Sequence, residues 1–431
     1  MNRLLFLAAL VFVTGCDLTV DNPNASTFED IEDSRDGLIA YANGVQRSYA
    51  VSALDNIVLT PGVTARELAI NRTFANLIDL EAGGSDLPTD NGNVNGLFTT
   101  LYSVAFDAGV LIETAGASDA VEDDLQSGLV ALGQFYRAAA FGALAQSFTQ
   151  VSLNPGAPGG ATYVNRDEAF AEAVRLMAEA EQGAQAASGN EAFQDLLPAG
   201  FDLVNSARAY RARFALFAGD YATAISAADA VDLGATSTFA YSSLAPNPIY
   251  SAFYVGTPSY AVRDGLGLAS IQDGDGRVDF YTDTTSVVSD PNGLAIDVAA
   301  GFFDDGLAAP LPVYLPDEIR LIRAEAIVRS GGDLDEAVEE INAVRTDTDD
   351  PFGVNAGLEE YDGPVTADAL LAEIYYNRAA ELFLQGLRFE DARRFGRPGP
   401  SSDPFQRNRD FYPFPDQERQ ENPNTPPNPS V

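Results

Sequence analysis

The sequence predicts an all-α protein built from repeated helix pairs, with long irregular loop insertions between them. Three observations support this fold class. Apolar residues recur with helical spacing in several segments, and Gly-Asp dipeptides separate pairs of such segments at two places. In addition, 46% of the residues are hydrophobic and 10% are aromatic, which is enough apolar material for one large core.

The chain begins with a segment typical of exported lipoproteins. Arg3 precedes an apolar run over residues 4–13, and Cys16 is the only cysteine. The run is shorter than the about 20 residues that span a bilayer, but it fits the core of a signal peptide. This order resembles a bacterial lipoprotein signal, which implies removal of residues 1–15, lipidation of Cys16 and a tether over residues 16–35. The alternative is an ordinary secretory signal beside a free thiol.

The segment 203–231 predicts the clearest helix pair. Gly219 ends the first helix, and Asp220 is a favourable N-cap for the second. The apolar face of the first helix carries residues at intervals of three and four: Leu203, Ala207, Tyr210, Phe214 and Phe217.

The segment 315–345 repeats the same design. An apolar stripe ends at Gly331, and Asp333 then begins a helix with Glu336 three residues later, as in a capping box. The two units resemble tetratricopeptide helix pairs, so the predicted scaffold is a tetratricopeptide-like helical repeat.

Further elements follow the same period more loosely. Helices are expected over residues 129–150 and 166–180 as a third pair, and over residues 367–387. Residues 71–96 and 235–312 are rich in Asn, Asp, Gly, Pro and Tyr, and we expect them to be irregular loops.

Composition excludes several classes of function. The chain has no histidine, no tryptophan and no lysine, so Ser-His-Asp catalysis and histidine-ligated metal sites are excluded. A net charge of −38 argues against nucleic acid as a partner. The acidity is explained either by attraction of cationic ligands or by a halophile-type acidic surface, and the second explanation is favoured because acids are spread along the whole chain.

Four stretches, in order, carry a resemblance to a known family: residues 133–153, 312–345, 381–396 and 412–424. They contain Gly-Gln-Phe-Tyr-Arg at 133–137, Leu-Ile-Arg-Ala-Glu-Ala at 321–326, Leu-Arg at 387–388 and Tyr-Pro-Phe-Pro at 412–415. With the lipoprotein signal, they resemble the SusD/RagB family of nutrient-binding lipoproteins. Residues 36–431 would then form one SusD-like ligand-binding domain.

The resemblance implies a function as well as a fold. The protein would be an outer-membrane lipoprotein that faces the cell exterior, contacts the membrane only through its lipid, and binds a nutrient oligomer such as a glycan or a peptide. It would deliver this ligand to a SusC-like TonB-dependent transporter, would not be an enzyme, and would need no cofactor or metal. The alternatives are a glycoside hydrolase with paired carboxylates and a tetratricopeptide-type scaffold for protein binding.

Candidate site residues divide into two groups. Charges beside apolar helix stripes are expected to form structural ion pairs: Arg323, Glu325, Arg378 and Glu381. Because the family does not fix its ligand residues by motif, ligand contacts are sought among aromatic, amide and arginine side chains of the two loop regions: Arg66, Arg72, Phe74, Asn93, Asn95, Tyr250, Tyr254, Tyr260 and Tyr281. The segment 273–279 resembles a calcium loop but has Arg277 where an oxygen ligand is needed.

Overall fold

The structure is a computed structural model that describes residues 34–157, 160–289 and 294–430. The predicted signal peptide, Cys16 and most of the predicted tether lie outside the described residues. The description therefore begins at the cap of the first helix, where the Ser34 hydroxyl accepts a hydrogen bond from the backbone N–H of Gly37 (3.1 Å).

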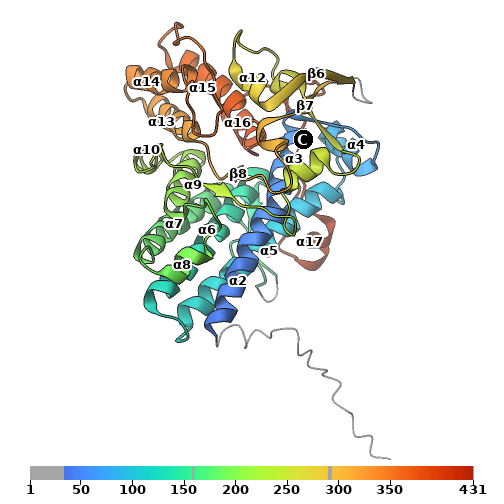
Figure 1. Cartoon of the computed structure of the whole chain (residues 1–431). Coiled ribbons are helices and arrows are strands. Elements are labelled where there is room, and N and C mark those ends of the chain that lie inside the picture. Colours follow the sequence, from blue (N-terminus) through green and yellow to red (C-terminus); the bar gives the residue numbers. More distant parts are fainter. Residues whose placement is uncertain (1–33, 158–159, 290–293, 431) are drawn as a thin grey trace, which may run out of the picture.

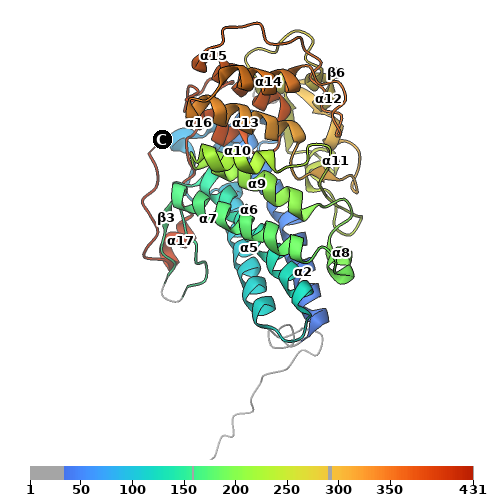
Figure 2. The same ribbon diagram turned by 90° about the vertical axis from the view of Figure 1, so that its left-hand side faces the viewer.

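Helices that follow one another in the chain also pack on one another, which produces a layered helical array (Figures 1 and 2). This confirms the predicted all-α, tetratricopeptide-like class. The main helices are α2 (Arg35–Arg47), α3 (Leu54–Thr64), α5 (Gly92–Ala117), α6 (Asp123–Ser147), α7 (Arg166–Ala186), α9 (Leu203–Phe217), α10 (Tyr221–Asp229), α13 (Pro316–Ser330), α14 (Leu334–Arg345) and α15 (Ala367–Glu381).

The two predicted helix pairs are α9–α10 and α13–α14, and α10 packs against α13. Asp220 caps α10 by accepting a hydrogen bond from the Thr223 N–H (3.1 Å). Gly331 ends α13 in the left-handed conformation with φ 74°, which glycine adopts without a steric penalty. The third predicted pair corresponds to α6 and α7, whereas the helix predicted over 367–387 ends earlier, at Glu381.

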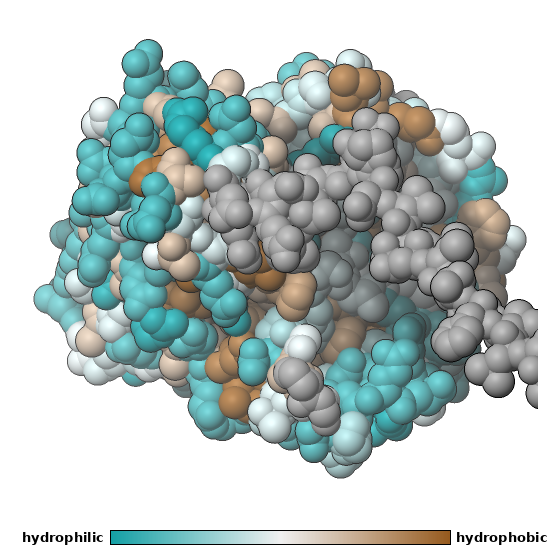
Figure 3. Space-filling view, turned by 90° about the horizontal axis from the view of Figure 1, so that it is seen from below, coloured by the Kyte–Doolittle hydropathy of each residue, from teal (hydrophilic) through white to brown (hydrophobic). Residues whose placement is uncertain are grey.

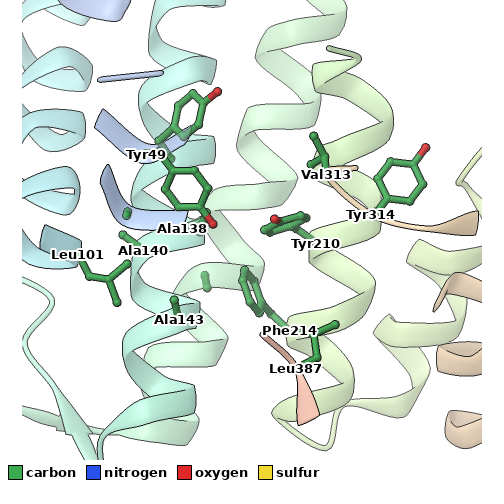
Figure 4. Packing of buried hydrophobic residues seen from close by; sticks show 14 of the residues in the cluster. Tyr49, Leu101, Ala138, Ala140, Ala143, Tyr210, Phe214, Val313, Tyr314 and Leu387 are labelled. Atoms are coloured by element: carbon green, nitrogen blue, oxygen red, sulfur yellow. The ribbon is translucent and has the colours of Figure 1, made fainter. Parts of the chain in front are cut away.

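Large aromatic side chains fill the space between helices because the facing helix carries small residues (Figure 4). Phe214 on α9 is 1% exposed and packs edge-on against Tyr210, with ring centroids 5.7 Å apart. A Cβ atom at Gly142 on α6 would lie only 2.1 Å from the Phe214 ring. The close approach of α6 and α9 therefore requires glycine at this position.

The two segments predicted to be irregular are more ordered than expected. Together with adjoining residues they form an antiparallel sheet in the order β1 (Leu68–Ile70), β5 (Tyr260–Arg263), β7 (Ala295–Ala299) and β6 (Thr282–Ser289). They also contain the short helices α4 (Ala75–Ala82), α11 (Pro248–Tyr254) and α12 (Gly276–Tyr281). The short helices and the strands β1 and β5 contain too few turns or alternations for periodicity to reveal them. Strand β6 has eight residues but is mostly polar, so it lacks the apolar alternation that predicts a strand.

The remaining elements are short and connect the helical layers. They are the π-helical segment η1 (Ser48–Ala53), the strand pairs β2 (Gln150–Val151) with β3 (Val164–Asn165) and β4 (Thr238–Phe239) with β8 (Leu311–Pro312), and the helices α8 (Glu191–Leu196), α16 (Arg388–Arg394) and α17 (Asp416–Glu421). Three short 3-10 helices complete the set of described elements: η2 (Gly84–Asp86), η3 (Asp264–Gly267) and η4 (Gly301–Phe303).

Among the described helices, only α5 has the length and hydropathy of a membrane span. In this structure α5 packs along α6 and also contacts α2. Its buried face includes Leu97, Leu101 and Leu111, each with no exposed surface. The apolar character of α5 is therefore explained by its place in the core. The surface seen from below is mainly hydrophilic, with smaller apolar patches (Figure 3).

All four residues proposed as structural charges take part in ion pairs. Arg323 contacts Asp229 (2.8 Å), Glu336 and Glu340, so it ties α13 to both α10 and α14. Arg378 binds Asp391 through two hydrogen bonds of 2.9 and 3.1 Å. Glu325 forms ion pairs with both Arg329 and Arg394. Glu381 forms an ion pair with Arg277.

Three buried carboxyl groups lie close together, one at the start of α13, one at the end of α15 and one in the loop after α14. They are Asp317, Asp350 and Glu381, and each keeps one oxygen without a hydrogen-bond partner among the described residues. Burial raises the pKa of all three, that of Asp317 to about 7, and the charges of Asp317 and Asp350 raise the pKa of Glu381 further. Folding therefore favours the protonated form of Asp317.

The contribution of Asp317 to the free energy of unfolding should fall as pH rises from about 4 to about 7. The folded state holds a proton on Asp317 that the unfolded chain, with a pKa of 3.8, has already released. Asp317→Asn cannot ionise, so its melting temperature relative to wild type should be higher near pH 8 than near pH 5. Thermal melts across this range test the prediction, with the exposed Asp349→Asn as control. Parallel curves for wild type and Asp317→Asn would contradict it.

Candidate functional site

An open pocket of about 680 Å³ lies where the two predicted loop regions meet. It is bounded by η1 and α3, by α4 and the start of α5, and by α11 and β5. The lining residues are Val51, Asp55, Asn56, Leu59, Thr60, Asn76, Gly92, Asn93, Pro246, Pro248, Ser251, Ala252 and Tyr260. Its volume lies in the range of small-molecule binding sites.

Among the described lining residues, only Asp55 on helix α3 carries a charge. Its Oδ1 atom accepts hydrogen bonds from the backbone N–H and the side-chain amide of Asn56, at 2.6 and 2.8 Å. No arginine pairs with it among the described residues. Burial raises the pKa of Asp55, and the two hydrogen bonds from Asn56 lower it by a smaller amount, so the resulting pKa is about 6. At neutral pH the carboxylate is therefore mostly ionised and can accept hydrogen bonds from a ligand.

The N-terminus of α5 is fixed to α4 by asparagines. Asn91 caps α5 by accepting hydrogen bonds from the backbone N–H groups of Asn93 (3.0 Å) and Val94 (3.3 Å). Its own amide donates to the backbone carbonyl of Asn76 at 2.8 Å. This cap turns the Asn93 side chain toward the pocket and toward β5.

A chain of hydrogen bonds then crosses the pocket wall. The Asn76 amide donates to Asn93 Oδ1 (2.5 Å), and the Asn93 amide donates to the Tyr260 hydroxyl (2.9 Å). Burial raises the pKa of Tyr260 to about 12, so its hydroxyl stays protonated at neutral pH. Because the Tyr260 oxygen accepts from Asn93, its proton remains available to a ligand.

The opposite wall is α11, whose start is held rigidly. Asn247 is fully buried and caps the helix through Ile249 and Tyr250, at 2.9 and 3.0 Å. Pro248 occupies the first turn, where a missing N–H costs nothing. Two other side chains of α11 are outside the pocket lining: the rings of Tyr250 and Tyr254 stack with their centroids 5.1 Å apart. The Tyr254 hydroxyl donates to the Ala299 carbonyl.

Comparisons with known proteins agree with this architecture. Residues 317–429 match the model of the SusD family. The resemblance to the SusD/RagB family is confirmed. A SusD superfamily protein from Bacteroides thetaiotaomicron superposes with a TM-score of 0.72 at 17% identity, covering 94% of this chain and 100% of that one. A SusD superfamily protein from Parabacteroides distasonis gives 0.70 at 16%, covering 92% and 99%.

One similar structure carries a functional description. It is a SusD-like carbohydrate binding protein from Bacteroides vulgatus, with a TM-score of 0.64 at 15% identity, covering 83% of each chain. At this identity the similarity establishes the fold alone. No curated protein matches the chain.

In this SusD-like chain, two of the nine candidate ligand residues, Asn93 and Tyr260, line the pocket. Phe74 is 58% exposed and precedes α4, two residues before the lining residue Asn76, but it is not part of the lining itself. Asn95 lies one turn into α5, and its Oδ1 atom is buried without a partner among the described residues. Arg72 lies in the turn between β1 and α4, outside the lining.

Two candidates are structural instead. The guanidinium of Arg66 is buried and donates to the carbonyls of Gln406 (3.1 Å) and Glu81 (2.8 Å). Tyr281 is fully buried and donates to the Glu381 carbonyl at 2.7 Å. Both side chains are turned into the fold and lie outside the pocket lining, so neither is among the groups that this pocket offers to a ligand.

The structure also explains the calcium-like segment. Asp275 caps α12, and its two carboxylate oxygens accept hydrogen bonds from Arg277 at 2.8 and 2.7 Å. The Tyr376 hydroxyl donates to the same carboxylate at 2.7 Å. This segment is therefore a structural turn held by an internal cation.

Sequence reasoning missed the α3 side of the pocket. Asp55 and Asn56 stand next to each other inside an otherwise mostly apolar helix, directly after a π-helical segment. π-helical segments are frequently found at functional sites. The adjacent polar pair was the signal that could have identified this wall.

Proposed function

We propose that this protein captures a neutral nutrient oligosaccharide in the pocket between α3, α5 and α11, and that it binds this ligand without chemical change. The observation that carries the proposal is the composition of the lining. It offers amides, hydroxyls and one carboxylate beside the ring of Tyr260, and sugars are bound by such planar hydrogen-bonding groups next to apolar faces.

The pocket favours binding over hydrolysis. Glycoside hydrolases of the usual kind place two carboxylic acids across the scissile bond. Within the described lining, Asp55 is the one carboxylate, so the second acid of such a mechanism is missing there. A peptide-binding scaffold is less well supported, because the pocket wall is built from side-chain amides and a phenol rather than from an open strand edge.

The charge of the pocket also selects against acidic ligands. Asp55 is mostly ionised at neutral pH, the described lining residues include no arginine, and the chain carries a net charge of −38. A uronate or another anionic sugar would be repelled by this field. The proposed ligand is therefore a neutral glycan, and tyrosine and the exposed Phe74 take the place that tryptophan holds in other sugar sites.

The remaining parts of the proposal concern location and partner. A lipid on Cys16 would hold the folded domain at the outer membrane, facing the cell exterior. A SusC-like TonB-dependent transporter would then receive the ligand. The lipoprotein-type N-terminus and the SusD-like fold support this arrangement.

A titration series with charge-matched ligands tests the proposed site. Among maltoheptaose, cellohexaose and xylohexaose, at least one should bind at neutral pH, and oligogalacturonate should bind at least about tenfold more weakly, a difference of about 1.4 kcal/mol. Asp55→Asn should narrow that gap, and Asn93→Ala should weaken neutral binding, because each change removes a group of the wall. The exposed Asp90→Asn serves as control.

Two outcomes would contradict the proposal. One is an oligogalacturonate that binds wild type as tightly as every neutral oligosaccharide. The other is unchanged affinity for a bound neutral ligand in both Asp55→Asn and Asn93→Ala.

A further inference from the structure

A second pocket of about 450 Å³ opens on another side of α5, between that helix, the β2–β3 connection and α17. None of its lining residues belongs to the pocket described above. Its defining feature is a wall of aromatic rings with two carboxyl groups among them. The rings are Phe98, Tyr102, Phe106 and Tyr163, and the acids are Asp107 and Glu418.

The rings are held in place by specific contacts. Phe98 and Tyr102 pack edge to face with centroids 4.6 Å apart, and the Tyr102 hydroxyl accepts a hydrogen bond from the Ser152 N–H (2.8 Å). The Phe106 ring lies on Gly156, where a Cβ atom would approach it to 2.8 Å. Gly156 has φ 80°, so glycine is favoured there both by the backbone and by the ring above it. Phe106 nevertheless stays 43% exposed.

The two acids lack a cationic partner among the described residues. Asp107 accepts one hydrogen bond, from the Tyr41 hydroxyl at 3.3 Å. Glu418 accepts hydrogen bonds from the Tyr163 hydroxyl and from the Asn422 amide, both at 2.7 Å.

Two arginines close to this pocket in sequence or through Leu153 donate hydrogen bonds to groups other than its two acids. Arg419 donates to the Pro426 carbonyl (2.9 Å) and to Asn428 (2.8 Å), and Arg137 donates to the Leu153 carbonyl (3.2 Å). Neither side chain lines the pocket. The described lining therefore combines two carboxyl groups and four aromatic rings, and neither acid is ion-paired among the described residues.

We propose that this second pocket binds a small organic cation, an ammonium compound with an apolar body. The faces of aromatic rings attract cations, and the attraction is stronger for a partly desolvated cation. Asp107 and Glu418 add direct charge attraction, and the acidic protein as a whole raises the local concentration of cations. A neutral ligand of the same shape would gain only the apolar contact.

Two ligands of the same shape distinguish recognition of charge from apolar contact. One is choline, and the other is its neutral isostere, in which a tert-butyl group replaces the trimethylammonium group. Calorimetric titration of the purified protein at fixed ionic strength should give choline an affinity at least about fivefold above that of the isostere. Asp107→Asn should remove most of this preference. Phe106→Leu keeps apolar bulk but removes the π face, so it should weaken choline more than the isostere.

Two control variants distinguish the pocket from the general acidic field. Asp119→Asn removes an exposed charge outside both pockets, and Asp55→Asn removes the charge of the other pocket; both should bind choline as wild type does. Equal affinities for choline and the isostere would overturn the proposal, and so would choline affinity that is unchanged in Phe106→Leu and Asp107→Asn. Absence of choline binding up to about 10 mM, an affinity weaker than about 3 kcal/mol, would overturn it as well.

Discussion

Arg277→Met should lower the free energy of unfolding by roughly 3–5 kcal/mol, the effect of breaking a buried ion pair on one side. Arg277 has no exposed surface. Its guanidinium binds both oxygens of Asp275, donates to Asn377 Oδ1 (3.1 Å) and lies 3.5 Å from Glu381 Oε2. Methionine fills much of the same volume but leaves two buried carboxyl groups without their cation.

Urea denaturation of a double-mutant cycle measures this effect. Asp275→Asn in the Arg277→Met background removes one of the abandoned charges, so the double variant should be less destabilised than the sum of the two single variants. Arg175→Met is the matched control, because Arg175 pairs with Glu172 and Glu179 at the surface and such pairs contribute about 0–1 kcal/mol. Equal losses for Arg277→Met and Arg175→Met would contradict the structural role.

The helical scaffold could be predicted from the sequence because its signals are local. The stripe that contains Phe214 has a period set by one helix, and Asp220 and Gly331 act as a cap and a stop within a few residues. The sheet could not be predicted, because β1 pairs with β5 across almost 200 residues of chain and these two strands have only three and four residues. Strand pairing over such distances leaves little trace in composition or periodicity.

The candidate site could be predicted only in part. Asn93 and Tyr260 belong to the two loop regions that the sequence marked as rich in recognition groups, and they meet in one pocket wall. Arg66 carries the residue type that sugar sites use, but its left-handed backbone, with φ 70°, and its carbonyl partners place it inside the fold. Residue type alone does not distinguish a ligand group from a structural one.

Blocking the main pocket should abolish capture of the ligand, whatever groups recognise it. Gly92 lines that pocket, and a Cβ atom built there meets nothing within 4 Å, so a side chain at this position extends into open space. Gly92→Cys should therefore fold and bind as wild type does. The only native cysteine, Cys16, is replaced by serine in the same protein, which leaves one thiol for modification.

A maleimide-linked polymer attached to that thiol should fill the pocket. The same Gly92→Cys protein before modification then serves as the first control. Gly189→Cys provides the second control, because Gly189 is exposed in the turn before α8 and lies outside both pockets. The decisive measurement is the affinity of the best neutral oligosaccharide before and after modification of Gly92→Cys. We predict a loss of at least about tenfold, or 1.4 kcal/mol, with no change in modified Gly189→Cys. Unchanged affinity of the modified Gly92→Cys protein would show that the ligand binds elsewhere.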